Sequence, residues 1–446
     1  MATGDFRVVI VGGGPVGLTT AHALSLAGID FVLLEQRHDH DPDVGASLVL
    51  GPNSMRVMHQ LGLFDALTAV GSQFGHQKVF NTAGRELKNT TATAKLFRKN
   101  HGTAPVLFYR AELMQVLQQG LSDEARGKIL MGKKIVGIAS DSDGVCVSCA
   151  DGTTYTGSMV LGADGVHSKT RRLMRELALE TDACADWDRQ KLYTSTYRAM
   201  WFSFPRTSKP GEAFETQHKD RAVVYFTSRD RGWVLLTERL PHPTEDSPVY
   251  EEKDISAFAD RFAEFPVSET LKVKDVFAVR KAAGMSDLAE GLARHWSWGR
   301  IVLAGDSCHK FTPNSGLGFN NGVQDVVALC NQLHKLTTAS KGVPDMAALT
   351  DSFQRYQVDR RKALRPHAFV STHLIRANTW TNTPYYLLAR YIMASKRLEY
   401  LLLKLVVSRF IRNGLVLDYV RAEEPFLAAV SWKHPLKGFG ASQEGQ

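Results

Sequence analysis

The stretch RVVIVGGGPVGLTTAHALSLAGIDFVLLEQR, residues 7–37, constrains the fold of this chain more than any other. The apolar run at 8–11 predicts a buried parallel strand that ends in a glycine-rich turn. Apolar residues at helical spacing follow over 18–26, Gly28 ends that helix, and 31–35 predicts a second strand. We therefore expect a β-α-β unit at the start of a parallel sheet.

The turn has the G-x-G-x-x-G spacing of a dinucleotide site, formed by Gly12, Gly14 and Gly17. In such a turn the first glycine permits the tight bend, the second lets backbone approach a pyrophosphate, and the third lets the helix pack closely. The helix N-terminus adds free N–H groups and partial positive charge. Glu35 follows Gly17 by 18 residues, where a carboxylate can accept both hydroxyls of a ribose. These residues predict a dinucleotide and leave NAD and FAD both open.

Composition narrows the class of protein and its partners. The chain has 446 residues with 44% hydrophobic and 22% charged content, as expected for a large globular enzyme. Its net charge of +8 favours anionic ligands such as nucleotide phosphates, or a membrane surface. We find no finger, RNP or basic-helix motif and expect no nucleic-acid partner. The N-terminal sequence lacks a signal-peptide pattern, so we expect a cytoplasmic protein.

Five cysteines are scattered along the chain, and two of them form the C-x-x-C spacing Cys146 to Cys149. They lie in an alternating stretch that predicts a strand, where residues three apart point to opposite faces. We therefore expect buried thiols there, and no metal site in this protein.

Four further segments look like parts of one site. They are VGASLVLGPN with Gly45 and Ala46, a helix-patterned stretch opened by Arg110, GADGVHSKTR with Asp164, and GDSCHKFTPNSGLGFNNGVQD with Asp306. With the first glycine turn, in this order, they resemble the single-component FAD monooxygenases of the flavoprotein aromatic hydroxylase group. VGASLVLGPN and the basic C-terminal part are also similar to fungal monooxygenases of natural-product pathways, which act on indole alkaloids and terpenoid–polyketide hybrids.

The resemblance implies a non-covalent FAD and positions around it. It places Glu35 at the adenosine ribose, Arg110 at the pyrophosphate and Asp306 at the ribityl chain. Around the isoalloxazine ring it places Gly45 and Ala46, then Pro313 near the reactive edge, and Gly316 and Gly318 where backbone passes close to the ring. Asp164 belongs to a motif that handles both FAD and NADPH, and Arg171 is expected to brace it. Asn320 or Asn321 is expected to cap the next helix, and Phe319 to point away into packing. No second glycine fingerprint is present, so NADPH is expected as a transient reductant.

The expected fold class is α/β, with a Rossmann-type FAD-binding domain, an antiparallel-sheet substrate domain and C-terminal helices. The FAD-binding domain is expected to be discontinuous, over 1–70, 101–180 and 285–370. The substrate domain is expected over 71–100 and 181–284, and the helical region over 371–446. Alternation predicts substrate-domain strands at 192–204, 222–228, 232–240 and 275–284.

Two residues of these strands are candidates for catalysis. Arg198 is aligned with Met200 and Phe202 on one strand face, and an unpaired buried cation would be costly. It therefore either forms a salt bridge at the sheet edge or hydrogen-bonds the substrate. Tyr225, central in its strand, is the second candidate, and a core tyrosine with a satisfied hydroxyl is the alternative.

The resemblance implies a reaction with NAD(P)H and O₂, through a flavin C4a-hydroperoxide, on a hydrophobic polycyclic natural product. The substrate strands show no convincing histidine or aspartate base, which favours indole 2,3-epoxidation, with or without rearrangement, in fungal alkaloid biosynthesis. A terpenoid alkene epoxidase and a phenol hydroxylase are the alternatives. A flavin oxidase or reductase is the alternative of another class.

The segment 384–417 has leucines and tyrosines at helical spacing, interrupted by seven charges between 390 and 412. These charges exclude a bilayer-spanning helix, which needs about 20 apolar residues. Core or lid packing is the first interpretation. A basic helix in peripheral contact with a membrane surface is the second.

Overall fold

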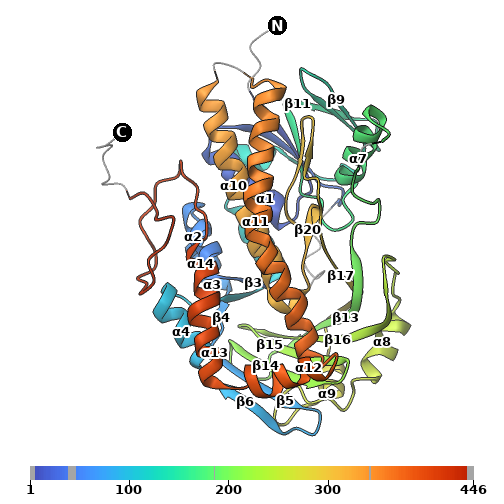
Figure 1. Ribbon diagram of the computed structural model, residues 1–446, viewed down its shortest axis with the longest axis vertical. Coiled ribbons are helices and arrows are strands. Elements are labelled where there is room, and N and C mark those ends of the chain that lie inside the picture. The colour runs from blue at the N-terminus through green and yellow to red at the C-terminus, as the bar shows by residue number, and fades with distance from the viewer. Residues whose placement is uncertain (1–5, 39–46, 185, 341–342, 439–446) are drawn as a thin grey trace.

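A computed structural model describes residues 6–38, 47–184, 186–340 and 343–438. Two large sheets form its two halves, and long helices connect them (Figure 1). In the described residues, six strands make the first sheet, in the order β18-β19-β12-β1-β2-β8. Its strands are β1 (Arg7–Val11), β2 (Asp30–Leu34), β8 (Ile129–Leu130), β12 (Met159–Gly162), β18 (Ser297–Trp298) and β19 (Ile301–Leu303).

The centre of this first sheet is parallel and buried. β1 pairs in parallel with β2 on one side and with β12 on the other, and β12 pairs in parallel with β19. Side chains on both faces of β1 are buried, as the continuous run at 8–11 predicts, because α1 (Pro15–Leu26) and β11 (Thr154–Gly157) both pack against this strand. Helix α1 starts with proline at its first turn, where a missing N–H costs nothing. The predicted β-α-β unit is confirmed.

The second sheet is mostly antiparallel and has the order β20-β17-β13-β16-β15-β14-β5-β6 in the described residues. Its strands are β5 (His76–Asn81), β6 (Glu86–Thr90), β13 (Thr194–Pro205), β14 (Glu212–His218), β15 (Arg221–Thr227), β16 (Arg231–Thr244), β17 (Ala282–Leu292) and β20 (His309–Lys310). Only the contact of β14 with β5 is parallel among these pairs. Two smaller sheets hold β3 (Ser47–Leu50), β4 (Ser72–Gln73) and β7 (Val106–Tyr109), and β9 (Ile135–Ser140), β10 (Val145–Cys149) and β11 (Thr154–Gly157).

Two long helices, α10 (Leu317–Ala339) and α11 (Met346–Asn378), pack against each other; α10 also packs against α1, and α11 extends down to the second sheet (Figure 1). The other helices are α2 (Pro52–Gln60), α3 (Phe64–Val70), α4 (Ala92–His101), α5 (Arg110–Gln119), α6 (Asp123–Gly127), α7 (Lys169–Thr181), α8 (Glu252–Asp260) and α9 (Val273–Phe277). The chain then forms α12 (Thr383–Leu387), η3 (Leu388–Met393), α13 (Lys396–Leu402), η4 (Leu403–Val407) and α14 (Ser408–Arg412). The expected α/β class with C-terminal helices is confirmed, while the domain boundaries stay a prediction.

Two local expectations were wrong. The stretch 275–284 is not one strand, because 273–277 forms α9 and β17 starts only at Ala282. The Asp275 carboxylate accepts from the Lys272 backbone N–H at 2.8 Å, which stabilises the start of that helix. Asn320 and Asn321 do not cap α10, because this helix already begins at Leu317.

Candidate active site

A cavity of about 2130 Å³ lies between the glycine turn after β1 and one face of the second sheet. The predicted cofactor residues that line it are Gly12, Gly14, Glu35, Arg110, Asp164, Asp306, Pro313, Gly316 and Gly318. They come from segments up to 306 residues apart, from position 12 to position 318. Gly17 lies behind the turn, and Gly45 and Ala46 fall outside the described residues. The contacts of all these residues with a dinucleotide stay a prediction.

The three fingerprint glycines have different surroundings. Gly12 has φ +106°, and a Cβ there would lie 2.6 Å from the Ala163 carbonyl oxygen. A Cβ at Gly17 would lie 1.9 Å from the Gly12 oxygen, so the helix packs directly on the turn. Gly14 is different, because a Cβ there would meet no protein atom within 4 Å. The space beside Gly14 is therefore open to a ligand, at the N-cap of α1, where no side chain caps the helix.

The Glu35 carboxylate is oriented by backbone donors at the end of β2. Its Oε2 accepts from the Gly13 N–H at 2.6 Å, and its Oε1 accepts from the Arg37 N–H at 2.9 Å. A carboxylate has about four lone-pair positions, so both oxygens can still accept from ribose hydroxyls. This geometry fits the predicted ribose contact.

Arg110 begins α5 and lies in the same cavity. Burial and the nearby charge of Arg37 lower the pKa of Arg110, while Asp306 and Glu35 raise it. A partly buried guanidinium is costly unless anions satisfy its donors, and its planar fork suits a phosphate. Arg110 therefore fits the predicted pyrophosphate contact.

The Asp164 carboxylate accepts hydrogen bonds from residues at the start of α7. It accepts from the Ser168 hydroxyl at 2.5 Å and from the Thr170 N–H at 2.9 Å. Arg171 does not touch this carboxylate; it donates to the Ser307 carbonyl at 2.7 Å. The expected brace is therefore indirect, because Arg171 joins the Asp164 turn to the loop that carries Asp306.

The loop after β19 and the start of α10 bring the backbone of Gly316 and Gly318 to the cavity. Asp306 forms an ion pair with Lys310 there. Gly316 has φ +63° and is the N-cap of α10, whose first N–H groups no side chain caps. Phe319 packs in the buried core, as expected, but it also borders the cavity, which was not expected.

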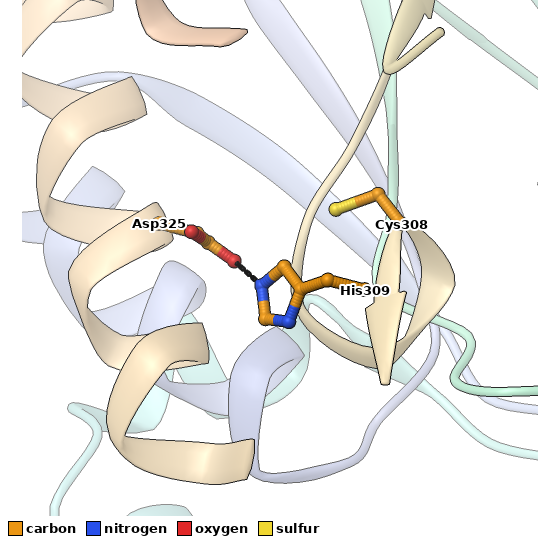
Figure 2. A group of neighbouring side chains, drawn as sticks. All are labelled: Cys308, His309 and Asp325. Atoms are coloured by element: carbon orange, nitrogen blue, oxygen red, sulfur yellow. Dashed lines mark hydrogen bonds and ion pairs between the residues drawn. The ribbon is translucent and has the colours of Figure 1, made fainter. Parts of the chain in front are cut away.

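A buried ion pair fixes this loop against the long helices. His309 points its ring at Asp325 of α10, with Nε2 and Oδ2 2.5 Å apart (Figure 2). The other oxygen, Oδ1, accepts from Arg360 Nε of α11 at 2.7 Å. Cys308 lies close enough for the three groups to share a cation. The Arg360 charge already compensates the carboxylate, so we assign the group to structure.

The structure does not bring the two predicted catalytic residues to the cavity. Tyr225 is fully buried on the opposite face of the second sheet, in the core cluster that packs under α8 and α9. Its hydroxyl lies 2.7 Å from Ser208 Oγ, and its ring stacks on Phe214. This placement favours the alternative stated for Tyr225, a core tyrosine with a satisfied hydroxyl, and its catalytic role stays a prediction.

Arg198 shares that opposite face and lines a separate pocket of about 450 Å³. Its Nε is 3.4 Å from Asp287 Oδ1, and its guanidinium lies over the Tyr250 ring at 5.3 Å. This geometry favours the salt-bridge alternative for Arg198, and a contact with substrate stays a prediction.

Sequence reasoning missed the residues that form the substrate side of the cavity. Trp201, Trp233 and Phe226 of the second sheet line it, as do Phe97 of α4 and Leu403 of η4. Glu215 of β14 also lines the cavity, and it places a carboxyl group beside these apolar side chains. An alternation count identifies two faces of a strand but not which face meets a cavity.

The glycine turn and Glu35 fit a dinucleotide-binding protein, and the apolar wall fits an apolar substrate. A family model described as an FAD binding domain matches residues 5–353. The FAD-dependent monooxygenase olcE of Penicillium canescens is 32% identical over 79% of this chain and 77% of its own. The FAD-dependent monooxygenase verC1 of Penicillium polonicum is 30% identical over 80% of this chain, which spans only 45% of that relative.

A solved structure shows the same fold. Klebsiella pneumoniae HpxO, complexed with FAD and uric acid, has a TM-score of 0.72 at 19% identity, over 92% of this chain and 97% of its own. The chain belongs to the FAD-dependent monooxygenase family of oxidoreductases, and its cofactor is FAD. The predicted resemblance and cofactor are confirmed.

Proposed function

We propose that this protein uses NAD(P)H and O₂ to epoxidise or hydroxylate a hydrophobic polycyclic natural product, and that the reaction is indole 2,3-epoxidation in alkaloid biosynthesis. The observation that carries the proposal is one continuous cavity with two unlike ends. One end has the glycine turn, Glu35 and Arg110, which suit FAD; the other has tryptophan, phenylalanine and leucine side chains, which suit a polycyclic substrate. FAD supplies the oxygen-transfer chemistry, and the protein orients the substrate and excludes water.

A second candidate, phenol hydroxylation, is favoured by one observation. A phenol gains reactivity when a base accepts its proton, and Glu215 places a carboxyl in the substrate wall. A terpenoid alkene needs no such group and would use the apolar wall alone. An oxidase or reductase would remove or add hydride without inserting oxygen.

Labelled oxygen separates these functions. Purified protein is incubated with FAD, NADPH and ¹⁸O₂, and with a 3-alkylindole, a phenol or a terpenoid alkene in parallel reactions read by mass spectrometry. We expect one labelled oxygen atom in the indole product for each NADPH consumed. A labelled phenol or alkene product would select that alternative. Oxidised product without label would identify an oxidase and contradict the proposal, and the same assay with NADH defines the reductant.

We also propose that the C-terminal apolar surface contacts a membrane in peripheral fashion. This surface comprises the exposed side chains of Tyr386, Leu387, Tyr391, Ile392, Leu398, Tyr400, Leu401, Leu402, Leu405 and Val406. Exposed cations lie among them at Lys396, Arg397, Lys404 and Arg409. Apolar and aromatic groups beside cations suit an anionic lipid surface. No described helix is long and apolar enough to cross a bilayer, so the contact would be superficial.

Vesicle sedimentation tests this surface. Wild-type protein is expected to sediment with phosphatidylcholine–phosphatidylserine vesicles and less with phosphatidylcholine alone. Replacing Leu401 and Leu405 together by serine should weaken partitioning roughly tenfold, about 1.4 kcal/mol, because both side chains leave the lipid. The control Leu26→Ser changes an equally exposed leucine on α1, 48% exposed against 47% for Leu401, and should have no effect. Wild-type protein that stays in solution would refute the proposal.

A further inference from the structure

The carboxyl group of Glu215 is chemically unlike its surroundings in the cavity wall. β14 pairs Glu215 with Val224 of β15, Val224 pairs with Leu235 of β16, and Leu235 pairs with Trp201 of β13. Directly paired residues point to the same face of a sheet, so this row faces the cavity that all four residues line. Burial raises the pKa of Glu215. A carboxyl group in such a row is costly unless it is hydrogen-bonded or paired with a cation.

The same carboxyl is positioned but only partly satisfied. Of the described residues, only Gln217 hydrogen-bonds it, donating from Nε2 to Oε1 at 2.9 Å. Gln217 is itself fixed, because its Oε1 accepts from the Trp380 indole N–H at 3.1 Å. The other carboxyl oxygen, Oε2, has no donor among the described residues, and the residue that carries it lines the cavity.

No cation in the described part of the chain compensates Glu215 directly. Lys88 lies on the same face of the sheet and partly lowers the pKa of Glu215, but its ammonium is engaged by Glu399 of α13 at 2.6 Å. Asp287 of β17, by contrast, accepts from the Tyr250 hydroxyl at 2.7 Å and also pairs with Arg198. Glu215 therefore retains capacity for a donor that the described residues do not supply.

We propose that Glu215 Oε2 accepts a hydrogen bond from a donor on the substrate, a ring N–H or a phenol O–H, and so orients the ring in the cavity. The inference rests on the proposed monooxygenase function and names the substrate class: an aromatic compound that carries a hydrogen-bond donor. A hydrogen bond to this carboxyl would limit how a flat aromatic ring can rotate against the apolar wall. Glu215 thereby determines which ring carbon faces the flavin end.

Matched ligands test the proposal without turnover. The FAD-loaded protein is titrated, through flavin absorbance changes, with 3-methylindole and 1,3-dimethylindole, and with 4-methylphenol and its methyl ether. We expect a donor probe to bind roughly 10- to 100-fold more tightly than its methylated partner, as for hydrogen bonds to charged groups. The indole pair and the phenol pair identify which donor the site takes.

Three variants distinguish binding from structure. Glu215→Leu should abolish the preference for donor probes and also raise the unfolding temperature, because an uncompensated carboxyl leaves an apolar row. Glu215→Gln keeps the shape and should retain a reduced preference. Glu212→Gln makes the same chemical change on the same strand, at a residue outside the cavity lining, and should behave as wild type.

Some results would overturn the inference. These are an unchanged preference in Glu215→Leu, or wild-type protein that binds neither donor probe better than its methylated partner. A lower unfolding temperature in Glu215→Leu, together with an unchanged preference in Glu215→Gln, would assign Glu215 to structure instead. Failure of the proposed function is recognised separately, because it appears as missing ¹⁸O incorporation whatever the probes do.

Discussion

Gly14→Ala is expected to weaken FAD binding by roughly 10- to 100-fold, about 1.4–2.7 kcal/mol, and to leave the fold intact. The added methyl group meets no protein atom within 4 Å, so the protein itself tolerates it. It occupies the space at the N-cap of α1, where the backbone of such a turn approaches a pyrophosphate. Titration of apoprotein with FAD, followed by flavin fluorescence, measures the affinity, and thermal unfolding without FAD measures the fold.

Two other glycines make this experiment specific. Gly17→Ala should lower both affinity and unfolding temperature, because its Cβ would lie 1.9 Å from the Gly12 oxygen. Gly127→Ala, at the end of α6 with no atom within 4 Å, should change neither. Equal FAD affinity in Gly14→Ala and wild type would mean that FAD does not pass beside this turn.

Asp325→Asn is expected to destabilise the protein by about 3–5 kcal/mol, as the removal of one partner from a buried ion pair does. The buried Asp325 carboxylate accepts from Arg360, His309 and the Gly305 N–H, and asparagine leaves the Arg360 charge uncompensated. The loop that carries Asp306 would lose its anchor to α10 at the same time. Denaturant unfolding of FAD-loaded protein at one fixed FAD concentration measures the loss.

An exposed pair on α11 provides the control. Asp351→Asn removes a partner of Arg355, 2.6 Å away on the surface, and should cost at most about 0.5 kcal/mol. Equal unfolding midpoints for Asp325→Asn and Asp351→Asn would exclude the anchoring role.

The stability difference between wild type and Asp325→Asn depends on pH through the pKa of Asp325. Burial would raise this pKa, but the charges of His309 and Arg360 lower it below the ordinary 3.8. A lowered carboxyl pKa contributes stability that is present above the unfolded value and lost as pH falls through the folded value. The stability difference between wild type and Asp325→Asn should therefore stay constant from pH 7 down to pH 5. It should shrink only when the pH falls below the ordinary carboxyl pKa of 3.8.

The cofactor end of the site was predictable because its chemistry lies in short patterns. Gly12, Gly14, Gly17 and Glu35 occur within one β-α-β unit, where local spacing determines spatial proximity. Asp164 and Asp306 were found through family resemblance, since nothing in their local sequence places them in one cavity. The structure brings all of these except Gly17 to the cavity lining.

The substrate end was not predictable in the same way. Both faces of β13 are apolar, with Ala199 and Trp201 on one and Met200 and Phe202 on the other, so alternation alone does not select the cavity face. Helices α8 and α9 decide which face of β13 is covered, because they pack on the face that carries Met200. Both helices lie far from β13 in the sequence. For this reason the sequence did not indicate that Tyr225 lies on the face away from the cavity.

Glu215 was missed because of its strand. Residues 212–218 read EAFETQH, and glutamate is depleted in strands, so local propensity gives little signal there. The strand forms because β5 and β15 pair with it from both sides, a tertiary effect that a local pattern does not contain.

The parallel pairing of β1, β12 and β19 has a consequence for biosynthesis. These adjacent strands occupy residues 7–11, 159–162 and 301–303, so the central sheet cannot be completed until the ribosome has made about two thirds of the protein. Contacts this distant along a polypeptide close slowly and leave apolar strand edges exposed meanwhile. Loading with flavin must then await synthesis of this last strand, and a nascent polypeptide arrested before residue 301 would depend on chaperones for its solubility.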